Sequence, residues 1–307
     1  MPANSLSWFV IVNPTSGNGL AKKKWPIIER LLQQHKFKFN YAYTDYPGHS
    51  KKLVKQALKQ NIRNIICVGG DGTIHNIVNG IMKQTYVASN SINVGVIPIG
   101  TGNDWVKTHK IPKDFERAIE IIKKGQIATQ DLGKIEFSNV NKNPVYYNNL
   151  AGIGFDGYVV SKVEKYKNLG AIAYLIGAFI SLFSFKNFES KVIVNSEEIS
   201  GKTLMILVGL CKYSGGGMQL TETPNPFDGL FDVSIVEDFS KIDILKNLPN
   251  LFNGKINTLK KVQRIKTAAI KIHVDQNEIP FIQADGELMG NGDINITLIP
   301  QAFSFYC

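Results

Sequence analysis

Residues 68–79 read Val-Gly-Gly-Asp-Gly-Thr-Ile-His-Asn-Ile-Val-Asn and lie where two sequence patterns meet. The residues before them, Asn64–Val68, are mainly a short apolar run of the kind that a buried strand shows. The apolar residues after the glycines recur at the spacing of one helix face: Ile74, Ile77, Val78, Ile81 and Met82. The glycines are therefore predicted to lie where a strand turns into a helix.

This turn has the features of a phosphate-binding loop. A helix N-terminus presents unpaired backbone N–H groups and the positive end of the helix dipole. Glycines allow positive φ and let a ligand approach the backbone closely, an arrangement that suits a phosphate. Asp71 would repel a phosphate unless a cation lay between them, so the stretch predicts nucleotide phosphate together with Mg²⁺. A tight turn with a solvated Asp71 is the alternative for this motif alone.

Length and composition predict a folded protein of about two domains. The 307 residues are 44% hydrophobic and 20% charged, as in soluble globular proteins. The three cysteines, Cys67, Cys211 and Cys307, lie far apart and give no disulfide framework. The first residues lack the basic and apolar segments of a secretory signal, so we expect the protein in the cytoplasm.

The net charge of +10 favours an anionic partner, such as a nucleotide, an acidic lipid surface or a nucleic acid. The lysines are dispersed, with small clusters at 22–24, 162–167 and 260–266. Because no basic stripe is interleaved with aromatic residues, we do not expect a nucleic-acid partner. Each cluster by itself is equally consistent with a solvated face.

One uncharged segment, Leu169–Phe185, resembles a membrane span in composition. Its 17 residues include two glycines and two serines, whereas a span needs about 20 mainly apolar residues. We interpret it as a helix that is buried in the fold or lines an apolar cleft.

The first half of the chain alternates strands with helices. Strands are predicted at 6–12, 37–43, 64–68 and 92–98, and helices near 21–35, 50–58, 74–82 and 114–124. This order predicts a parallel sheet with helices on both faces, which binds ligands beyond the carboxyl ends of its strands. The turns Asn13–Gly19 and Gly100–Asp104, residue Thr44 and the glycine turn all fall at that edge.

Beyond about residue 129 the pattern changes to short strands. Strands are predicted at 133–137, 145–150, 191–194, 204–210, 231–236, 270–274, 280–284 and 294–299, with helical stretches near 157–185 and 242–252. This pattern is typical of an antiparallel sandwich. The sequence therefore predicts an α/β domain over residues 1–128 and an all-β sandwich domain over residues 129–299.

Five motifs in a fixed order resemble one enzyme family. They are Asn13-Pro14-x-Ser16-Gly17, Gly69-Gly70-Asp71-Gly72-Thr73, Pro98-x-Gly100-Thr101-Gly102-Asn103-Asp104, Gly152-Ile153-Gly154-Phe155-Asp156 and Asp285-Gly286-Glu287. Together they resemble the diacylglycerol kinase catalytic family, specifically its soluble bacterial lipid-kinase branch. The Gly-Gly-Asp-Gly motif alone is less specific, because NAD kinases share it.

The resemblance implies a Rossmann-like nucleotide-binding domain, a β-sandwich lipid-substrate domain and a site in the cleft between them. It implies ATP contacts from Asn13, Pro14, Thr15, Ser16, Gly17, Thr44, Gly69, Gly70, Asp71, Gly72, Thr73, Ile74, His75 and Thr101. It also implies a structural Mg²⁺ in the second domain, with ligands at Asn225, Asp228 and Leu230. Residues 300–307 would return to the first domain, and relatives are often homodimers.

The resemblance further implies that Glu287 is the base that deprotonates the acceptor hydroxyl. A lipid hydroxyl is a poor nucleophile near neutral pH, so a positioned carboxylate is the expected aid. Phosphoryl transfer also needs positioning and charge neutralisation. Asp71 and Asp104 are therefore predicted to act at the catalytic centre by holding Mg²⁺ beside ATP, and Asp131 is a third candidate. Taken alone, Glu287 could equally be a solvated turn residue. Asp228, taken alone, could equally be a residue that forms a turn.

The chain departs from the family pattern beside the glycine turn. Asn76 stands where the family usually has Glu, and His75 replaces the commoner Asn. Trp105 and Lys107 stand where Phe and Arg are frequent. The loss of a carboxylate at position 76 puts the acceptor, rather than the fold, in doubt.

These observations predict an ATP-dependent lipid kinase that phosphorylates diacylglycerol or a related lipid at the membrane surface, giving phosphatidic acid. Such a kinase is expected to be cytoplasmic and to associate peripherally with membranes. Two alternatives remain open. One is a kinase for a sphingoid base or NAD, and the other is a catalytically silent nucleotide-binding protein, which Asn76 keeps in consideration.

Overall fold

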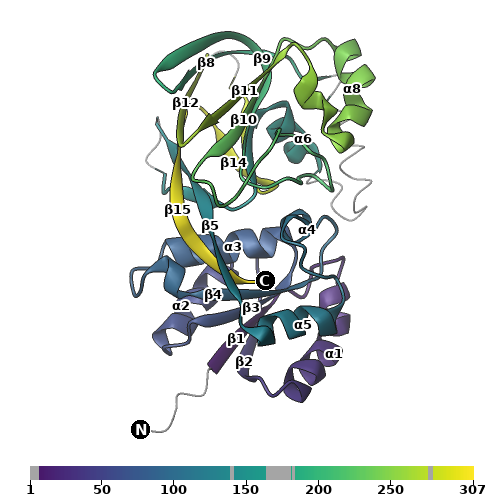
Figure 1. Cartoon of the computed structure of the whole chain (residues 1–307), viewed down its shortest axis with the longest axis vertical. Helices are drawn as coiled ribbons and strands as arrows, with labels where there is room; N and C mark the ends of the chain where they lie inside the picture. The colour runs from purple at the N-terminus through teal and green to yellow at the C-terminus, as the bar shows by residue number, and fades with distance from the viewer. Residues whose placement is uncertain (1–6, 139–141, 164–180, 182–183, 276–278) are drawn as a thin grey trace. The chain divides into compact units, whose positions relative to one another are not determined.

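The computed structural model divides the chain into two compact units, which are described separately here (Figure 1). It describes residues 7–138, 142–163, 181, 184–275 and 279–307. Unit 1 comprises Met1–Gln130 and Gln301–Cys307, and unit 2 comprises Asp131–Pro300. The boundaries predicted from the sequence, 128/129 and 299/300, differ from these by two residues and one residue.

Unit 1 alternates strands with helices. Its strands are β1 (Ser7–Val12), β2 (Lys38–Tyr43), β3 (Asn64–Gly69) and β4 (Asn93–Pro98). Its helices are α1 (Leu20–Gln34), α2 (Ser50–Lys59), α3 (Asp71–Met82), α4 (Asp104–Thr108) and α5 (Phe115–Lys124), with a short 3₁₀ helix, η1 (Ser89–Ser91). Two long strands, β5 (Ile127–Phe137) and β15 (Ile294–Tyr306), run from one unit into the other.

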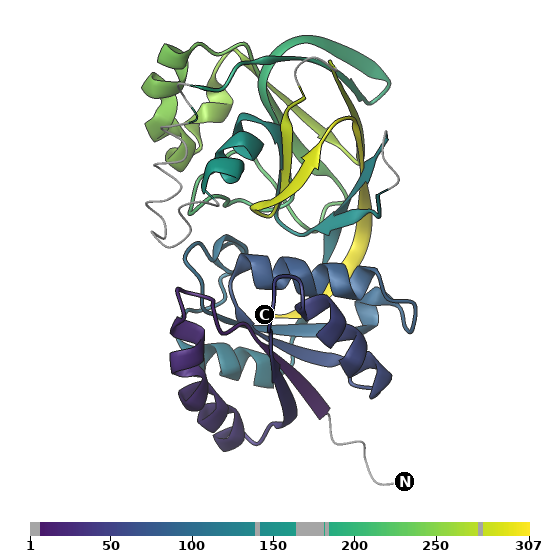
Figure 2. The ribbon, with the colours of Figure 1, turned by 180° about the vertical axis from the view of Figure 1, so that it is seen from behind.

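The strands of unit 1 form a parallel sheet in the order β2-β1-β3-β4, and the end of β15 pairs with β4. Because side chains alternate between the faces of a strand, Trp8, Val10 and Val12 share one face. On this face they pack with residues of α1 and α5 in a single buried cluster. Helices α2 and α3 contact each other and cover the other face (Figures 1 and 2). The parallel, two-faced sheet predicted from the sequence is confirmed.

Unit 2 consists mainly of antiparallel strands. They are β6 (Val145–Tyr147), β7 (Leu150–Gly154), β8 (Phe188–Val194), β9 (Glu197–Gly209), β10 (Phe231–Glu237), β11 (Val262–Thr267), β12 (Ala269–Val274), β13 (Phe281–Ala284) and β14 (Glu287–Asn291). The helices that can be described are α6 (Phe155–Val163), α8 (Lys241–Asn253) and the 3₁₀ helix η3 (Lys255–Thr258).

The strands of unit 2 follow the order β14-β13-β7-β9-β8-β12-β15, and β10 pairs with both β9 and β11. The pairings are antiparallel. One buried cluster includes Leu204, Leu207, Val236 and Phe239, with α8 residues packed against it. This antiparallel β-rich unit confirms the second predicted architecture.

The predicted strand at 145–150 combines β6 with only the first residue of β7. The sequence pattern did not predict α4, β11 and β14. These elements are short or strongly polar on one side, so they carry too few apolar residues to show a period. The predicted apolar helix at 169–185 lies almost wholly outside the described residues. Within the part of the chain that is described, no helix is long and apolar enough to cross a bilayer.

Candidate functional site

Four loops meet at the carboxyl edge of the unit 1 sheet. Backbone hydrogen bonds continue past the strand ends, from Asn13 N–H to the Val68 carbonyl (3.0 Å) and from Thr44 N–H to the Val12 carbonyl (2.9 Å). A third joins Ile99 N–H to the Gly69 carbonyl at 2.9 Å. The loops after β1, β2, β3 and β4 are therefore held side by side, as the parallel topology predicts.

Short polar side chains from three of these loops hydrogen-bond to one another. The Asn13 amide donates to Thr73 Oγ1 (2.9 Å), and the Asn13 carbonyl oxygen accepts from the Thr15 and Thr44 hydroxyls (2.9 and 3.4 Å). The Ser16 and Thr73 hydroxyls lie 3.4 Å apart. Five residues predicted to contact ATP thus form one network beside the start of α3.

Two glycines allow the loops after β3 and β4 to approach each other. A β-carbon on Gly70 would lie 3.0 Å from the Gly100 Cα, and one on Gly100 would lie 2.8 Å from the Gly70 Cα. Backbone on both sides of this contact leaves no flexible atom to move away. Any larger residue at Gly100 would therefore push apart the loops that carry Asp71 and Asp104.

Asp71 connects these loops electrostatically. Its carboxylate accepts the backbone N–H groups of Asp104 (3.1 Å) and Trp105 (3.2 Å), the first two residues of α4. A side-chain acceptor at a helix N-terminus satisfies otherwise unpaired donors. Asp71 therefore holds α4, and with it Asp104, beside the glycine turn.

The two carboxylates predicted to hold Mg²⁺ both lie next to Gly102. A β-carbon at Gly102 would be 3.2 Å from Asp71 Oδ2 and 3.4 Å from Asp104 Oδ2. Asp104 is buried. Two carboxylate oxygens that converge on one glycine are the ligand type that Mg²⁺ prefers. These residues therefore fit a divalent cation, although the described residues include no cluster of three or more His, Cys, Asp or Glu that could hold a metal.

The remaining residues predicted to contact ATP differ in how accessible their side chains are. Pro14, Gly17 and Thr101 are at least partly exposed in the loops after β1 and β4. The side chains of Ile74 and His75 are buried, and the His75 ring lies 3.3 Å from the Asn79 amide. Contact of these two residues with a nucleotide could involve only their backbone. Their role stays a prediction.

Asn76 has a specific role in the first turns of α3. Its side-chain amide donates to the Gly72 carbonyl at 2.8 Å. An ionised Glu at this position has no donor for that bond. The unusual residue therefore stabilises the glycine turn locally instead of adding a third carboxylate.

In unit 2, Glu287 follows a two-residue turn between β13 and β14. Ala284 pairs with Glu287 across this turn, and Asp285 and Gly286 both have positive φ, 53° and 79°. An Asp-Gly pair with these angles is typical of a tight hairpin turn. Among the described residues, none is hydrogen-bonded to or ion-paired with the partly exposed Glu287 carboxylate.

Asp285 fixes the base of this turn. Its carboxylate accepts the backbone N–H groups of Asn148 (3.1 Å), Asn149 (2.9 Å) and Leu150 (3.3 Å). Its own N–H donates to the Leu150 carbonyl at 2.9 Å. The turn is therefore tied to the start of β7 by four hydrogen bonds.

A buried polar pair supports the tip of the same turn. The Gln283 side-chain oxygen accepts Gly286 N–H (2.9 Å), and the Gln283 amide donates to Asp156 Oδ2 (2.7 Å). Asp156 Oδ1 accepts Gly157 N–H at 2.7 Å. Burial raises the pKa of Asp156 to about 6, and the hydrogen bonds from Gln283 and Gly157 lower it less than burial raises it. Asp156, Gln283 and Gly286 thus form a continuous chain that ends one residue before Glu287.

The loop predicted to hold a structural Mg²⁺ is satisfied internally. Asn225 Oδ1 accepts Phe227 N–H (3.2 Å), and Asp228 Oδ1 accepts Leu230 N–H (3.1 Å). Asp228 Oδ2 pairs with the Lys266 ammonium at 3.1 Å. Asn225 Oδ1 and both carboxylate oxygens of Asp228 are thus engaged by protein groups, and a lysine supplies the positive charge. In this arrangement the residues do not fit a divalent cation.

Asp131 contributes to the same loop in unit 2. It is buried, its Oδ2 accepts Gly229 N–H (2.9 Å) and its N–H donates to the Pro226 carbonyl (2.8 Å). These bonds explain a structural role at the start of the unit. They give no support for Asp131 as a metal ligand beside ATP.

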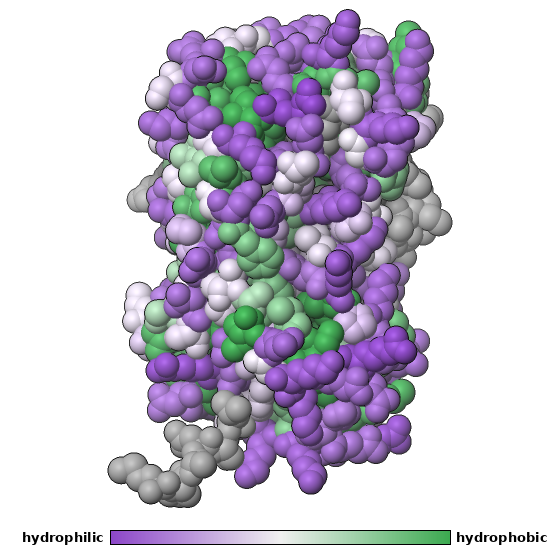
Figure 3. All heavy atoms as spheres, viewed as in Figure 1, coloured by the Kyte–Doolittle hydropathy of each residue, from purple (hydrophilic) through white to green (hydrophobic). Residues whose placement is uncertain are grey.

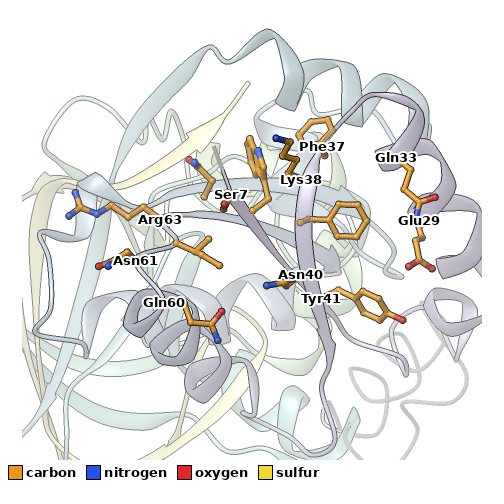
Figure 4. Close-up of a pocket in the computed structure, with 14 residues that line it drawn as sticks. Ser7, Glu29, Gln33, Phe37, Lys38, Asn40, Tyr41, Gln60, Asn61 and Arg63 are labelled. Carbon is orange, nitrogen blue, oxygen red and sulfur yellow. The ribbon is translucent and has the colours of Figure 1, made fainter. Parts of the chain in front are cut away.

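A large open pocket of about 1500 Å³ lies elsewhere in unit 1 (Figure 4). It is lined by residues at the beginnings of strands, including Ser7, Lys38 and Asn64. The amino ends of parallel strands lie at the edge opposite the loops described above. This pocket is therefore separate from the candidate nucleotide site.

Sequence reasoning missed the residues that hold the site together. It assigned no role to Asn103, whose amide donates to the Gly100 carbonyl (2.9 Å), or to Gln283. Asp156 was part of a motif but had no assigned function. For Asn103 a signal existed, since Asn tolerates the left-handed conformation found here (φ 52°). Gln283 had no such signal, because its partner Asp156 lies 127 positions away in the sequence.

Comparisons with known proteins agree with this geometry. The model for the diacylglycerol kinase catalytic domain matches residues 7–135, and that for the YegS C-terminal NAD kinase beta sandwich-like domain matches residues 149–307. A Bacillus subtilis (strain 168) protein named as a candidate lipid kinase, YtlR, is 28% identical over 306 residues, covering 95% of this chain and 97% of that protein.

A diacylglycerol kinase of Staphylococcus carnosus (strain TM300) is 27% identical over 301 residues, covering 97% of this chain and 94% of that protein. The crystal structure of a diacylglycerol kinase from Bacillus anthracis str. Sterne has a TM-score of 0.75 at 20% identity, covering 99% of this chain and 98% of that one. This structural match supports the fold alone. Together with the two family models, the sequence relatives show that the chain belongs to the diacylglycerol kinase catalytic family, in its bacterial lipid-kinase branch.

Proposed function

We propose that this protein transfers the γ-phosphate of ATP to the hydroxyl of diacylglycerol or a closely related membrane lipid. The observation that carries the proposal is the pair of carboxylates at Gly102, Asp71 and Asp104, beside the linked polar loops of unit 1. Backbone N–H groups, small polar side chains and paired carboxylates are the parts that phosphoryl transfer needs.

Within this proposal, Asn13, Thr15, Ser16, Thr44 and Thr73 line the phosphate-binding loops. Asp71 and Asp104 hold Mg²⁺, which neutralises charge on the phosphate oxygens when it is bound. Asp71 has a second task, because it also keeps α4 in place through the Asp104 and Trp105 N–H groups. Tight hydrogen bonding between the loops keeps this apparatus ordered before substrate arrives.

Glu287 is the proposed general base. It takes the proton of the acceptor hydroxyl as the oxygen–phosphorus bond to the lipid forms and the bond from the γ-phosphorus to the ADP oxygen breaks. The products are ADP and the lipid phosphate, which is phosphatidic acid when the acceptor is diacylglycerol. The fixed turn at Asp285 and Gly286 supports this role, since it restricts where the Glu287 carboxylate can point.

An acceptor panel tests the proposal. Purified protein is incubated with γ-labelled ATP, Mg²⁺ and one acceptor at a time: dioleoylglycerol in mixed micelles, sphingosine, or NAD. NAD is included because the second family model describes an NAD kinase-like β-sandwich. We expect label in the diacylglycerol product. Label in NAD alone would reject the lipid acceptor, and ATP binding without transfer to any acceptor would reject catalysis.

We also propose that the protein works at the cytoplasmic membrane surface without spanning it, because its substrate is a bilayer lipid. The net charge of +10 favours approach to anionic lipid. A homodimer is a further proposal that follows from the family only, and sedimentation equilibrium would test it.

A further inference from the structure

Helix α8 (Lys241–Asn253) presents apolar side chains on two sides. Ser240 and Asp243 cap its N-terminus reciprocally, and Gly254 ends it in the left-handed conformation (φ 75°). Ile244 and Leu251 pack against the buried cluster of unit 2. These contacts fix one face of the helix to the core, so its opposite side must face away from the core.

The outward side is unusually apolar. Ile242, Leu245 and Phe252 are 62%, 45% and 46% exposed, and Pro249 is also exposed. At about 100° per residue these four positions fall within an arc of about 80°. Most of the surface visible in Figure 3 is hydrophilic, with hydrophobic side chains in smaller areas. An exposed apolar row of this kind is a sign of an interaction surface.

Lysines border this row on both sides. On the same helical projection Lys241 lies next to Phe252, and Lys246 lies on the other side of Ile242. Both lysines are exposed, as are Lys255 and Lys260 beyond the helix. The only acidic residue between positions 241 and 261, Asp243, is engaged by the cap and by Lys261 at 3.6 Å. The row therefore has a positive rim.

We propose that the outward face of α8, made of Ile242, Leu245, Pro249 and Phe252 with Lys241 and Lys246 at its borders, docks on anionic phospholipid bilayers. A helix that lies in a membrane interface places its apolar face among the acyl chains and its lysines at the headgroups. Lysine stems suit this position because they extend along apolar surface while the ammonium stays at the headgroup level.

Charge distinguishes a bilayer from a second copy of the chain. In a symmetric dimer the same patch meets itself, so two lysine-bordered faces would bring like charges together. An anionic bilayer instead complements both the apolar row and its rim. The proposal extends the proposed function by naming the surface that meets the substrate membrane. Vesicle binding needs no turnover, so the two can fail separately.

Vesicle sedimentation tests the apolar row. Full-length protein is mixed with phosphatidylcholine vesicles that contain about one third phosphatidylglycerol, or none. We expect binding to the anionic vesicles, and a loss of at least about tenfold in the triple variant Ile242→Ser/Leu245→Ser/Phe252→Ser. The control Tyr86→Ser/Ile127→Ser removes side chains of similar exposure, 51% and 48%, away from α8 and should bind normally.

The lysine rim is tested in the same assay. Lys241→Glu/Lys246→Glu should weaken binding at least about tenfold, and added salt should weaken the binding of the wild type. Lys202→Glu/Lys271→Glu makes the same charge change at two exposed positions on strands and should weaken binding far less. Equal losses in both pairs would mean that overall charge, not α8, determines docking, and would overturn the proposal.

A spectroscopic variant reports directly on insertion. The native tryptophans, Trp8, Trp25 and Trp105, are buried and should give a constant background. Phe252→Trp should shift its emission to the blue on anionic vesicles, whereas Tyr86→Trp should not. An unchanged Phe252→Trp spectrum would overturn the proposal. So would concentration-dependent dimerisation that the triple serine variant abolishes, which would assign the face to a second copy.

Discussion

The two units use the same residue type for different purposes. In unit 1, the Asp71 and Asp104 carboxylates approach one glycine, where a β-carbon would lie 3.2 and 3.4 Å from their Oδ2 atoms. In unit 2, the Asp228 carboxylate pairs with Lys266, and Asp285 accepts three backbone N–H groups. Asp71 also accepts two backbone N–H groups, so hydrogen bonding alone does not separate the units. The difference is that a second carboxylate approaches the same glycine as Asp71, whereas Asp228 meets a lysine ammonium.

This difference shows why a motif cannot by itself assign a metal. Asn225–Leu230 and Gly69–Thr73 are both loops rich in turn-forming residues. In the second, the Asp71 and Asp104 carboxylates approach the same glycine. In the first, the Asp228 carboxylate meets the Lys266 ammonium, and the Asp131 carboxylate accepts the backbone N–H of Gly229. A cation site needs negative charge that the protein has not already balanced, and that balance depends on the tertiary partners.

The largest effect is expected from Asp71→Asn. The change removes one negative charge at Gly102 and one of the two acceptors that hold α4. We expect kcat/KM to fall by at least about 100-fold, with a higher Mg²⁺ requirement, because a preorganised electrostatic contact is lost. Steady-state kinetics over a Mg²⁺ series measures both.

Asp114→Asn is the matched control for Asp71→Asn. Asp114 caps α5 by accepting Arg117 N–H at 3.0 Å, but it lies outside the nucleotide loops. Because Asn caps a helix about as well as Asp, the change should leave both stability and kinetics close to wild type. Wild-type Mg²⁺ dependence in Asp71→Asn would contradict the role assigned to the two carboxylates.

A smaller effect is expected from disturbing the polar chain beside Glu287. Gln283→Glu places two acceptors face to face at Asp156, and Asp156→Asn places two amides there. Each should lower kcat about ten- to 100-fold by displacing the turn, with KM for ATP nearly unchanged. The double variant Asp156→Asn/Gln283→Glu reverses the donor direction and restores every bond, so kcat should recover.

Two measurements separate positioning from general destabilisation. Ser190→Ala/Thr203→Val removes a buried hydrogen bond of 2.8 Å elsewhere in unit 2 and should lower stability without lowering kcat. Amide exchange at Gly286 should quicken in Gln283→Glu and slow again in the double variant. Single variants that fold and keep wild-type kcat would show that the chain does not position Glu287.

The raised pKa of Asp156 predicts that the stability difference between Asp156→Asn and wild type depends on pH. Because the pKa of Asp156 is raised from 3.8 to about 6, the folded protein keeps a proton that the unfolded chain has already released. The stability that this bound proton gives the folded protein is fully present below pH 3.8 and is lost as pH rises through 6. The unfolding free energy of Asp156→Asn relative to wild type should therefore increase by about 2 kcal/mol between pH 4 and 7. Urea titrations at several pH values measure this, and a pH-independent difference would contradict the buried assignment.

The smallest effect is expected at the Asp228 loop. Because Lys266 already balances Asp228, EDTA should shift the thermal midpoint by less than about 2 °C. The measurement uses Asp71→Asn, which removes one carboxylate of the cation site proposed in unit 1. Lys266→Met leaves the carboxylate without its ammonium, and millimolar Mg²⁺ should then raise the midpoint. A large EDTA effect with Lys266 in place would mean that this loop holds a metal after all.

The fold was largely predictable because local pattern and topology agree in both units. Alternating strands and helices specify the parallel sheet, and the edge at which its loops meet follows from that topology alone. The loop residues Asn13, Thr44 and Thr73 can therefore be grouped from the sequence alone. Their hydrogen bonds confirm the grouping, while their contacts with ATP remain a prediction.

The supporting contacts could not be predicted in the same way. Asp71 as a cap for α4 and Gln283 as a partner of Asp156 join residues 33 and 127 positions apart. Sequence spacing does not encode such pairs. The pairing of Lys266 with Asp228 could not be predicted either, since a lone lysine on a strand most often faces solvent.

The role of Glu287 is the central claim, and Glu287→Gln tests it most directly. Glutamine keeps the size of the side chain but cannot accept the hydroxyl proton at neutral pH. With dioleoylglycerol micelles and saturating Mg²⁺-ATP, we predict that kcat falls about 10²–10⁴-fold while KM for ATP and the thermal midpoint stay close to wild type. A folded Glu287→Gln enzyme that turns over as fast as wild type would contradict the account.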